Sequence, residues 1–166
     1  HEHLKEVSHT APSGDSVPEY PIFFTKASTC IIGPNEPIIL PTLLSQKIDY
    51  EAELAVIIGK RAKNISESNA AEYIFGYMIA NDVTARDVQK RHQQWFLGKS
   101  LDGFLPTGPW IVTADEVNAH DLTIRCWVNQ ELRQQASTAS MIFSIPKLLQ
   151  TLTAGMTLEA GDIVIT

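Results

Sequence analysis

The segment Tyr50–Ile58 reads Tyr-Glu-Ala-Glu-Leu-Ala-Val-Ile-Ile and constrains the fold more than any other part of the chain. Side chains alternate along a strand, so Glu51 and Glu53 share one face, about 6.5 Å apart along the backbone. That face continues with Ala55 and Ile57, and the opposite face is entirely apolar. The segment therefore predicts a strand that carries two neighbouring carboxylates in apolar surroundings.

Two such carboxylates repel each other and lose hydration unless a cation or a proton compensates them. A hard divalent cation such as Mg²⁺ or Mn²⁺ suits an all-oxygen site. The alternative is an edge strand with Glu51 and Glu53 at its exposed start. Asp82 follows a second apolar run, Phe75–Ala80, and is a third candidate carboxylate, unless it caps a helix over Val83–Arg91.

Short β-like runs separated by turn residues make up most of the chain. Further strands are expected at Pro21–Ala27, Pro37–Pro41, Pro109–Thr113, Leu122–Val128, Glu131–Gln135 and Ile163–Ile165. One helix is expected from Ser66 to Tyr73. A second begins after the N-cap Ser144 and stops at Gly155. The pattern predicts a single mixed α+β, β-dominated domain over residues 1–166.

Composition excludes several classes of protein. The 13 Lys and Arg residues against 19 Asp and Glu give a net charge of −6, which argues against nucleic-acid binding. No apolar run approaches the roughly 20 residues that span a bilayer, so no membrane association is expected. Cys30 and Cys126 are too few for a disulfide scaffold, and a cytoplasmic location is expected.

Three other positions could carry chemistry. Arg86 lies one helical turn after Asp82 and could pair with it or bind an anionic substrate. Lys99 follows Trp-Phe-Leu-Gly and could be a substrate-binding ammonium, although most lysines are simply solvated. At the N-terminus, Glu6 could orient His3 as a general base, whereas an ordinary surface helix is the alternative.

The order of these pieces resembles the fumarylacetoacetate hydrolase family, in particular its bacterial acylpyruvase and 2-hydroxyhepta-2,4-diene-1,7-dioate isomerase-like branches. The motifs that carry the resemblance cover nearly the whole chain. They are His3–Glu6, Pro21–Lys26, Asp49–Lys60, Gly76–Asp87, Gln94–Ser100, Leu105–Trp110, Ser140–Ser144 and Gly155–Asp162.

The resemblance implies a β-roll or β-sandwich around a metal site, with Mg²⁺ or Mn²⁺ bound by Glu51, Glu53 and Asp82. It implies that Lys99 is the active-site lysine. Arg86 and Gln89 then lie near the substrate, and His3 and Glu6 form a water-activating dyad on a lid helix. The chain ends at Thr166, before the Gly-Thr-Pro loop of the family, and lacks its usual Asn-Tyr pair, so truncation at both ends is expected. Family members are commonly homodimers, which is the expectation here.

The implied activity is metal-dependent hydrolysis of a C–C bond in a small 2,4-dioxo acid, such as an acylpyruvate or a fumarylacetoacetate-like compound from aromatic catabolism. Oxaloacetate decarboxylation and 2-hydroxydienoate isomerisation are alternatives on the same metal site. A non-catalytic, metal-stabilised binding domain is the alternative of another class.

Overall fold

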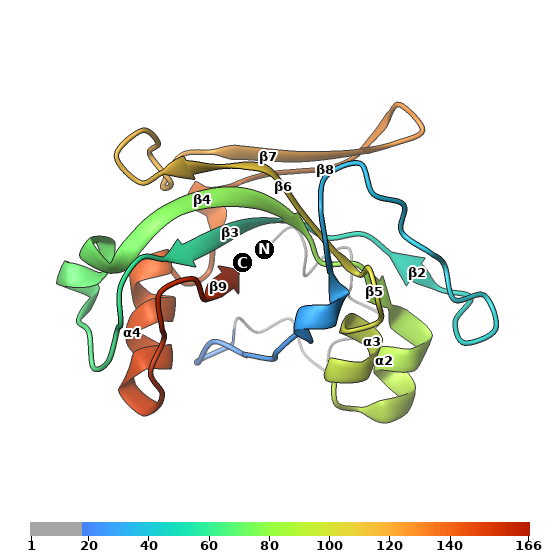
Figure 1. The fold of residues 1–166 in the computed structure, drawn as a ribbon, viewed down its shortest axis with the longest axis horizontal. Helices are drawn as coiled ribbons and strands as arrows, with labels where there is room; N and C mark the ends of the chain where they lie inside the picture. The colour runs from blue at the N-terminus through green and yellow to red at the C-terminus, as the bar shows by residue number, and fades with distance from the viewer. Residues whose placement is uncertain (1–17) are drawn as a thin grey trace. The chain divides into compact units, whose positions relative to one another are not determined.

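The computed structural model describes residues 18–166, in which strands and short helices alternate (Figure 1). The strands are β1 (Ile31–Ile32), β2 (Ile48–Asp49), β3 (Ala52–Ile58), β4 (Ile74–Asn81), β5 (Thr84–Ala85), β6 (Leu105–Thr113), β7 (Thr123–Val128), β8 (Glu131–Ser137) and β9 (Ile163–Ile165). The helices are the 3₁₀ turns η1 (Ser28–Cys30), η2 (Glu67–Tyr73) and η3 (Thr138–Ser140), and the α-helices α2 (Arg86–His92), α3 (Phe96–Lys99) and α4 (Ile145–Gly155).

The strands form three sheets. Five of them are ordered β1-β6-β4-β3-β9, while β2 pairs with β5 and β7 pairs with β8. The pairing of β1 with β6 is parallel, and those of β2 with β5 and of β7 with β8 are antiparallel. The mixed, β-dominated class predicted from the sequence is confirmed.

The chain divides into two compact units, and one of them contains Glu51, Glu53 and Asp82. This site unit comprises Phe23–Ala55, Met78–Ile111 and Ile165–Thr166. Its apolar core consists of small and β-branched side chains around the larger Phe104 and Leu105; the others are Cys30, Ala55, Ala80, Val83, Ala85 and Val88. The helices α2 and α3 pack against each other and against β5 (Figure 1).

Gly98 explains how closely α2 and α3 approach. A Cβ at this position would lie 2.7 Å from the backbone nitrogen of Gln89, nearer than real Cβ contacts allow. Only glycine therefore permits this packing without a shift. The close contact fixes α3 against α2, immediately before Lys99.

Among the described residues, the second unit comprises residues 18–22, Val56–Tyr77 and Val112–Val164. Its helix α4 packs on η2, and the Ser144 hydroxyl accepts a hydrogen bond from Lys147 N at 3.3 Å, as the predicted N-cap requires. The β7–β8 hairpin turns at Asn129 and Gln130, both with positive φ, as a two-residue type I′ turn requires.

No helix among the described residues is long and apolar enough to cross a membrane.

Two predicted strands are wrong. Neither Pro21–Ala27 nor Pro37–Pro41 forms a strand. Proline alone does not explain this, because Pro106 and Pro109 lie within β6; among the described residues these two runs have no neighbouring strand to pair with. The helix predicted over Ser66–Tyr73 is present as the 3₁₀ turn η2.

Candidate metal centre and active site

Three carboxylates meet at one point of the site unit. Glu51 lies just before β3, Glu53 is in β3, and Asp82 directly follows β4. Because β3 and β4 are neighbours in the five-stranded sheet, these positions are adjacent in space. One ligand oxygen from each carboxylate lies within 4.8 Å of the others. The sequence prediction that these three side chains cluster agrees with this geometry.

Hydrogen bonds from two main-chain N–H groups hold the segments around Glu51 and Asp82 together. Asp82 N donates to the carbonyl of Glu51 at 2.8 Å, and Glu51 N donates to Oδ1 of Asn81 at 3.0 Å. Asp82 therefore does not act as a helix cap, the alternative raised from the sequence. The helix α2 starts only at Arg86, after Ala85.

Burial and mutual repulsion change the acidity of the cluster. Glu51 and Asp82 are 3% and 0% exposed. Burial raises the pKa of Glu53 to about 8, with a further increase from the charges of Asp82 and Glu51, while Lys99 and Lys26 act in the opposite direction. Burial also raises the pKa of Asp82, against the same two lysines. These shifts mean that the charged forms of Glu53 and Asp82 are costly here, and a bound cation would stabilise them.

Lys99 supplies one compensating charge. Its Nζ donates to Oδ2 of Asp82 at 2.6 Å and also to Oε2 of Glu51. It lies 4.8 Å from the centroid of the Phe24 ring, which in turn meets Trp95 edge-on. The lysine is thus a buried member of the cluster rather than a solvated side chain.

Arg86 contacts two acids, and neither of them is Asp82, the partner considered in the sequence analysis. Its guanidinium donates to Oε1 of Glu51 at 2.6 Å and to Oδ2 of Asp49 at 2.8 Å, and it has no hydrogen bond with Asp82. Gln89, one turn further along α2, accepts from Arg86 Nη1 at 3.4 Å. Arg86 therefore lies against two carboxylates and Gln89 lies against Arg86, while the substrate contacts that the resemblance implies for both residues stay a prediction.

Sequence reasoning missed two members of this site, Lys26 and Asp49. Lys26 lies 56 positions from Asp82 in the chain, yet its Nζ is 2.6 Å from Oδ1 of that carboxylate. The sequence offered one indication of Lys26, namely that it ends the motif Pro21–Lys26, which is among those that resemble the family. His3 and Glu6, the predicted dyad, lie outside the described residues.

The donor set fits a hard divalent cation. All three clustered groups are carboxylates, the ligands that Mg²⁺ and Mn²⁺ prefer, and within residues 18–166 no sulfur or imidazole joins this cluster. Oxygens of Glu51 and Asp82 already share one cationic partner, Lys99. The geometry therefore allows one positive centre to contact more than one carboxylate at once.

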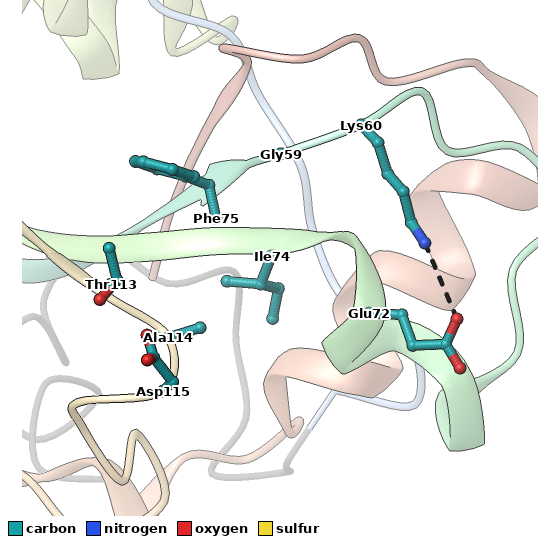
Figure 2. A pocket seen from close by; sticks show the side chains of 8 residues that line it. All are labelled: Gly59, Lys60, Glu72, Ile74, Phe75, Thr113, Ala114 and Asp115. Carbon is teal, nitrogen blue, oxygen red and sulfur yellow. Dashed lines mark ion pairs between the residues drawn. The ribbon is translucent and has the colours of Figure 1, made fainter.

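The open groove drawn in Figure 2 belongs to the other unit and contains none of these residues. It is lined by Gly59, Lys60, Glu72, Ile74, Phe75, Thr113, Ala114 and Asp115. Its charged groups include an exposed pair, Lys60 and Glu72, 3.7 Å apart. This pair offers convenient control positions, because both side chains are far more exposed than those of the carboxylate cluster.

Comparison with known proteins gives a consistent result. Residues 1–166 match the family described as "Fumarylacetoacetate (FAA) hydrolase C-terminal". The chain is 48% identical to oxaloacetate tautomerase YisK of Bacillus subtilis, covering 90% of this chain and 50% of that protein. It is 44% identical to the mitochondrial oxaloacetate tautomerase fahd2 of Xenopus laevis, over 98% of this chain and 52% of the other.

Solved structures agree in fold. A fumarylacetoacetate hydrolase from Exiguobacterium antarcticum is 50% identical, with a TM-score of 0.86, and the match covers 87% of this chain and 52% of that one. A 2-hydroxyhepta-2,4-diene-1,7-dioate isomerase from Mycobacterium marinum is 42% identical, with a TM-score of 0.85 and coverage of 89% and 57%. The chain thus spans about half the length of these relatives.

Proposed function

Because the chain belongs to the fumarylacetoacetate hydrolase family, whose members are enzymes, we propose that it is a divalent-cation-dependent enzyme acting on a small 2-oxo acid. One observation carries the proposal. Three carboxylates bring oxygens within 4.8 Å of one another, and a buried lysine contacts two of them. This combination would provide a cation site with a fixed positive group beside it.

Glu51, Glu53 and Asp82 would hold the cation. When bound, it would supply Lewis-acid polarisation of the 2-oxo carboxylate, which makes the neighbouring carbon more acidic. The Lys99 ammonium is fixed beside the carboxylates and is suited to hydrogen-bond the oxygen on which negative charge develops. Arg86 presents a planar guanidinium, and we expect it to bind a carboxylate of the substrate.

The reaction that these groups support best is keto–enol tautomerisation of an oxaloacetate-like acid. In this reaction the carbon next to the ketone loses a proton, the ketone oxygen gains one, and the double bond moves from C=O to the adjacent C–C bond, with no other group added or lost. It requires stabilisation of an enolate and no activated water. Two relatives that are 44–48% identical carry the name oxaloacetate tautomerase, which supports this choice.

Hydrolysis of a C–C bond in a 2,4-dioxo acid is the second candidate. The similarity to the Exiguobacterium hydrolase favours it. Hydrolysis also needs an activated water, which the predicted pair His3 and Glu6 would supply. The leaving fragment would be an enolate, which the same Lys99 ammonium would stabilise. Dienoate isomerisation, the reaction named for the Mycobacterium marinum neighbour, and oxaloacetate decarboxylation use the same enolate chemistry.

One assay series separates these reactions. Purified protein with Mg²⁺, with Mn²⁺ or with EDTA is tested for oxaloacetate tautomerisation and decarboxylation, acylpyruvate hydrolysis and hydroxydienoate isomerisation. We expect metal-dependent tautomerisation that the Glu51→Gln/Glu53→Gln variant loses and the exposed control Glu72→Gln keeps. Activity retained by the double variant would refute the metal role.

A second variant distinguishes tautomerisation from hydrolysis. His3→Ala should abolish acylpyruvate hydrolysis but leave tautomerisation unchanged, because only hydrolysis needs an activated water. Tight metal binding with no turnover of any of these substrates would instead indicate a metal-stabilised binding domain. The homodimer and the cytoplasmic location stay predictions, and light scattering after size-exclusion chromatography tests the first.

A further inference from the structure

The four oxygens of Glu51 and Asp82 are divided among three cationic side chains. Oε2 of Glu51 and Oδ2 of Asp82, here called the inner oxygens, both accept from Lys99 Nζ. The other two, here called the outer oxygens, accept from separate cations. Arg86 donates to Oε1 of Glu51 at 2.6 Å, and Lys26 donates to Oδ1 of Asp82 at 2.6 Å. Each carboxylate is therefore held at its outer side and shares Lys99 at its inner side.

Lys26 makes more than this ion pair. Its Nζ also donates to the backbone carbonyl of Lys99, and it lies 3.5 Å from the carbonyl of Val83. The Lys26 side chain is 5% exposed. An ammonium has three donors, and the contacts here direct them to the carboxylate and to two main-chain oxygens. The side chain is thus fixed by partners on both sides of the site.

These contacts link two parts of the site. One is the orientation of the Asp82 carboxylate, because a bond to Oδ1 determines where Oδ2 points. The other is the backbone at the end of α3, from which the Lys99 side chain extends. The backbone at Ala27 adds to the link, since its nitrogen donates to the Ser100 hydroxyl at 3.0 Å. Hydrogen bonds therefore connect Lys26 and Ala27 to Lys99 and Ser100.

We propose that Lys26 is a positioning residue, which holds the outer oxygen of Asp82 and the Lys99 carbonyl so that the inner oxygens face the cation site. The inference rests on the proposed function in one respect, namely that the three carboxylates bind a divalent cation. Lys99 would instead compete with that cation, because its ammonium already hydrogen-bonds both inner oxygens. The two lysines carry the same charge beside the same carboxylates but have different roles.

This difference gives the test. If charge alone mattered, replacing either lysine by methionine would remove one repelling positive charge, and both variants would bind a divalent cation more tightly. If Lys26 orients Asp82, Lys26→Met should bind Mn²⁺ about tenfold more weakly, as for other outer-shell partners of metal ligands. Lys99→Met should bind Mn²⁺ as tightly as the parent protein or more tightly.

The measurement is Mn²⁺ affinity, by calorimetry and by electron paramagnetic resonance, on the parent protein, Lys26→Met, Lys99→Met and Lys26→Arg. The exposed Lys60→Met is the control and should match the parent. Lys26→Arg keeps the charge and the donors, so it should recover most of the affinity lost in Lys26→Met. Equal or tighter Mn²⁺ binding by Lys26→Met would overturn the proposal.

A crystal structure of the parent protein with Mn²⁺ keeps the proposal testable even if Lys26→Met does not fold. We expect Lys26 Nζ to remain on Oδ1 of Asp82 and on the Lys99 carbonyl, with Lys99 Nζ displaced from an inner oxygen. Departure of Lys26 from Asp82 would overturn the proposal. Absence of Mn²⁺ binding by the parent protein would instead refute the cation site itself, so the two failures are distinguishable.

Discussion

Lys99 Nζ lies 2.6 Å from Oδ2 of Asp82, so the lysine predicted to stabilise negative charge directly contacts a predicted metal ligand. Both side chains are almost fully buried. A buried ion pair of this kind costs desolvation and is weak evidence for stability on its own. The pair is therefore better understood through function than through stability.

Replacing Lys99 by methionine should reduce turnover of the metal-loaded protein by about 10²- to 10³-fold, the usual loss when one donor to a developing oxyanion is removed. Steady-state kinetics at saturating Mg²⁺ measure this effect. Lys99→Arg should restore little of the activity, because a planar guanidinium does not occupy the place of a compact ammonium. Lys60→Met, at an exposed position, should retain full activity.

Removing one metal ligand should weaken cation binding strongly. We expect Glu53→Gln to lower Mg²⁺ affinity by more than about 100-fold, beyond the range seen when only outer-shell partners are changed. Titration calorimetry gives this affinity directly. Glu72→Gln has the same change of charge at an exposed position and should have no effect. Unchanged affinity in Glu53→Gln would exclude Glu53 as a ligand.

The stability of the metal-free protein should decrease as pH rises from about 4.5 to about 8. In the unfolded chain Glu53 titrates near its usual value of 4.5, whereas in the folded protein its pKa is about 8. Between these values the folded state keeps a proton that the unfolded state has released, so the free energy of unfolding falls with pH. Thermal unfolding in EDTA across this range tests the prediction.

Two comparisons isolate the contribution of Glu53 to that pH dependence. Glu53→Gln cannot release the proton, so its stability should fall less steeply over the same range. Saturating Mg²⁺ should remove or reverse the fall in the parent protein, because cations bind the deprotonated carboxylates. A slope identical in the parent protein and in Glu53→Gln would contradict the raised pKa.

Arg86→Lys should raise KM for a dicarboxylate substrate by about tenfold. The guanidinium of Arg86 contacts Glu51 and Asp49 together, and a lysine ammonium lacks the planar fork that makes such paired contacts. The control is Arg125→Lys, which should leave KM unchanged. Arg125 lies on β7, and its Nε donates to Oε1 of Gln135 at 2.8 Å. A KM unchanged by Arg86→Lys would show that Arg86 is not a substrate contact.

Gly98→Ala should destabilise the protein by about 1–3 kcal/mol, the usual cost of overpacking. The added Cβ would lie 2.7 Å from Gln89 N, and α3 would have to move away from α2. The matched control is Gly155→Ala at the end of α4, where a Cβ would have no heavy atom within 4 Å. This control should be neutral or slightly stabilising in chemical denaturation.

Much of the local structure could be predicted from the sequence, because short-range rules apply to it. Period-two alternation placed Glu51 and Glu53 on one face, and the capping residue Ser144 marked the start of α4. The same rules failed for the proline-flanked runs Pro21–Ala27 and Pro37–Pro41. Strand formation there depends on a partner for each N–H, which residue patterns alone do not reveal.

Taken alone, the sequence determined the carboxylate motifs, the positions of the best helix and hairpin, and the similarity to a family. The tertiary structure determined which charges meet. Lys26 is 56 positions from Asp82, and Lys99 is 48 positions from Glu51, yet they share one cluster. Such contacts depend on strand order and on the backbone bond between Asp82 and Glu51, and no local preference encodes either of them.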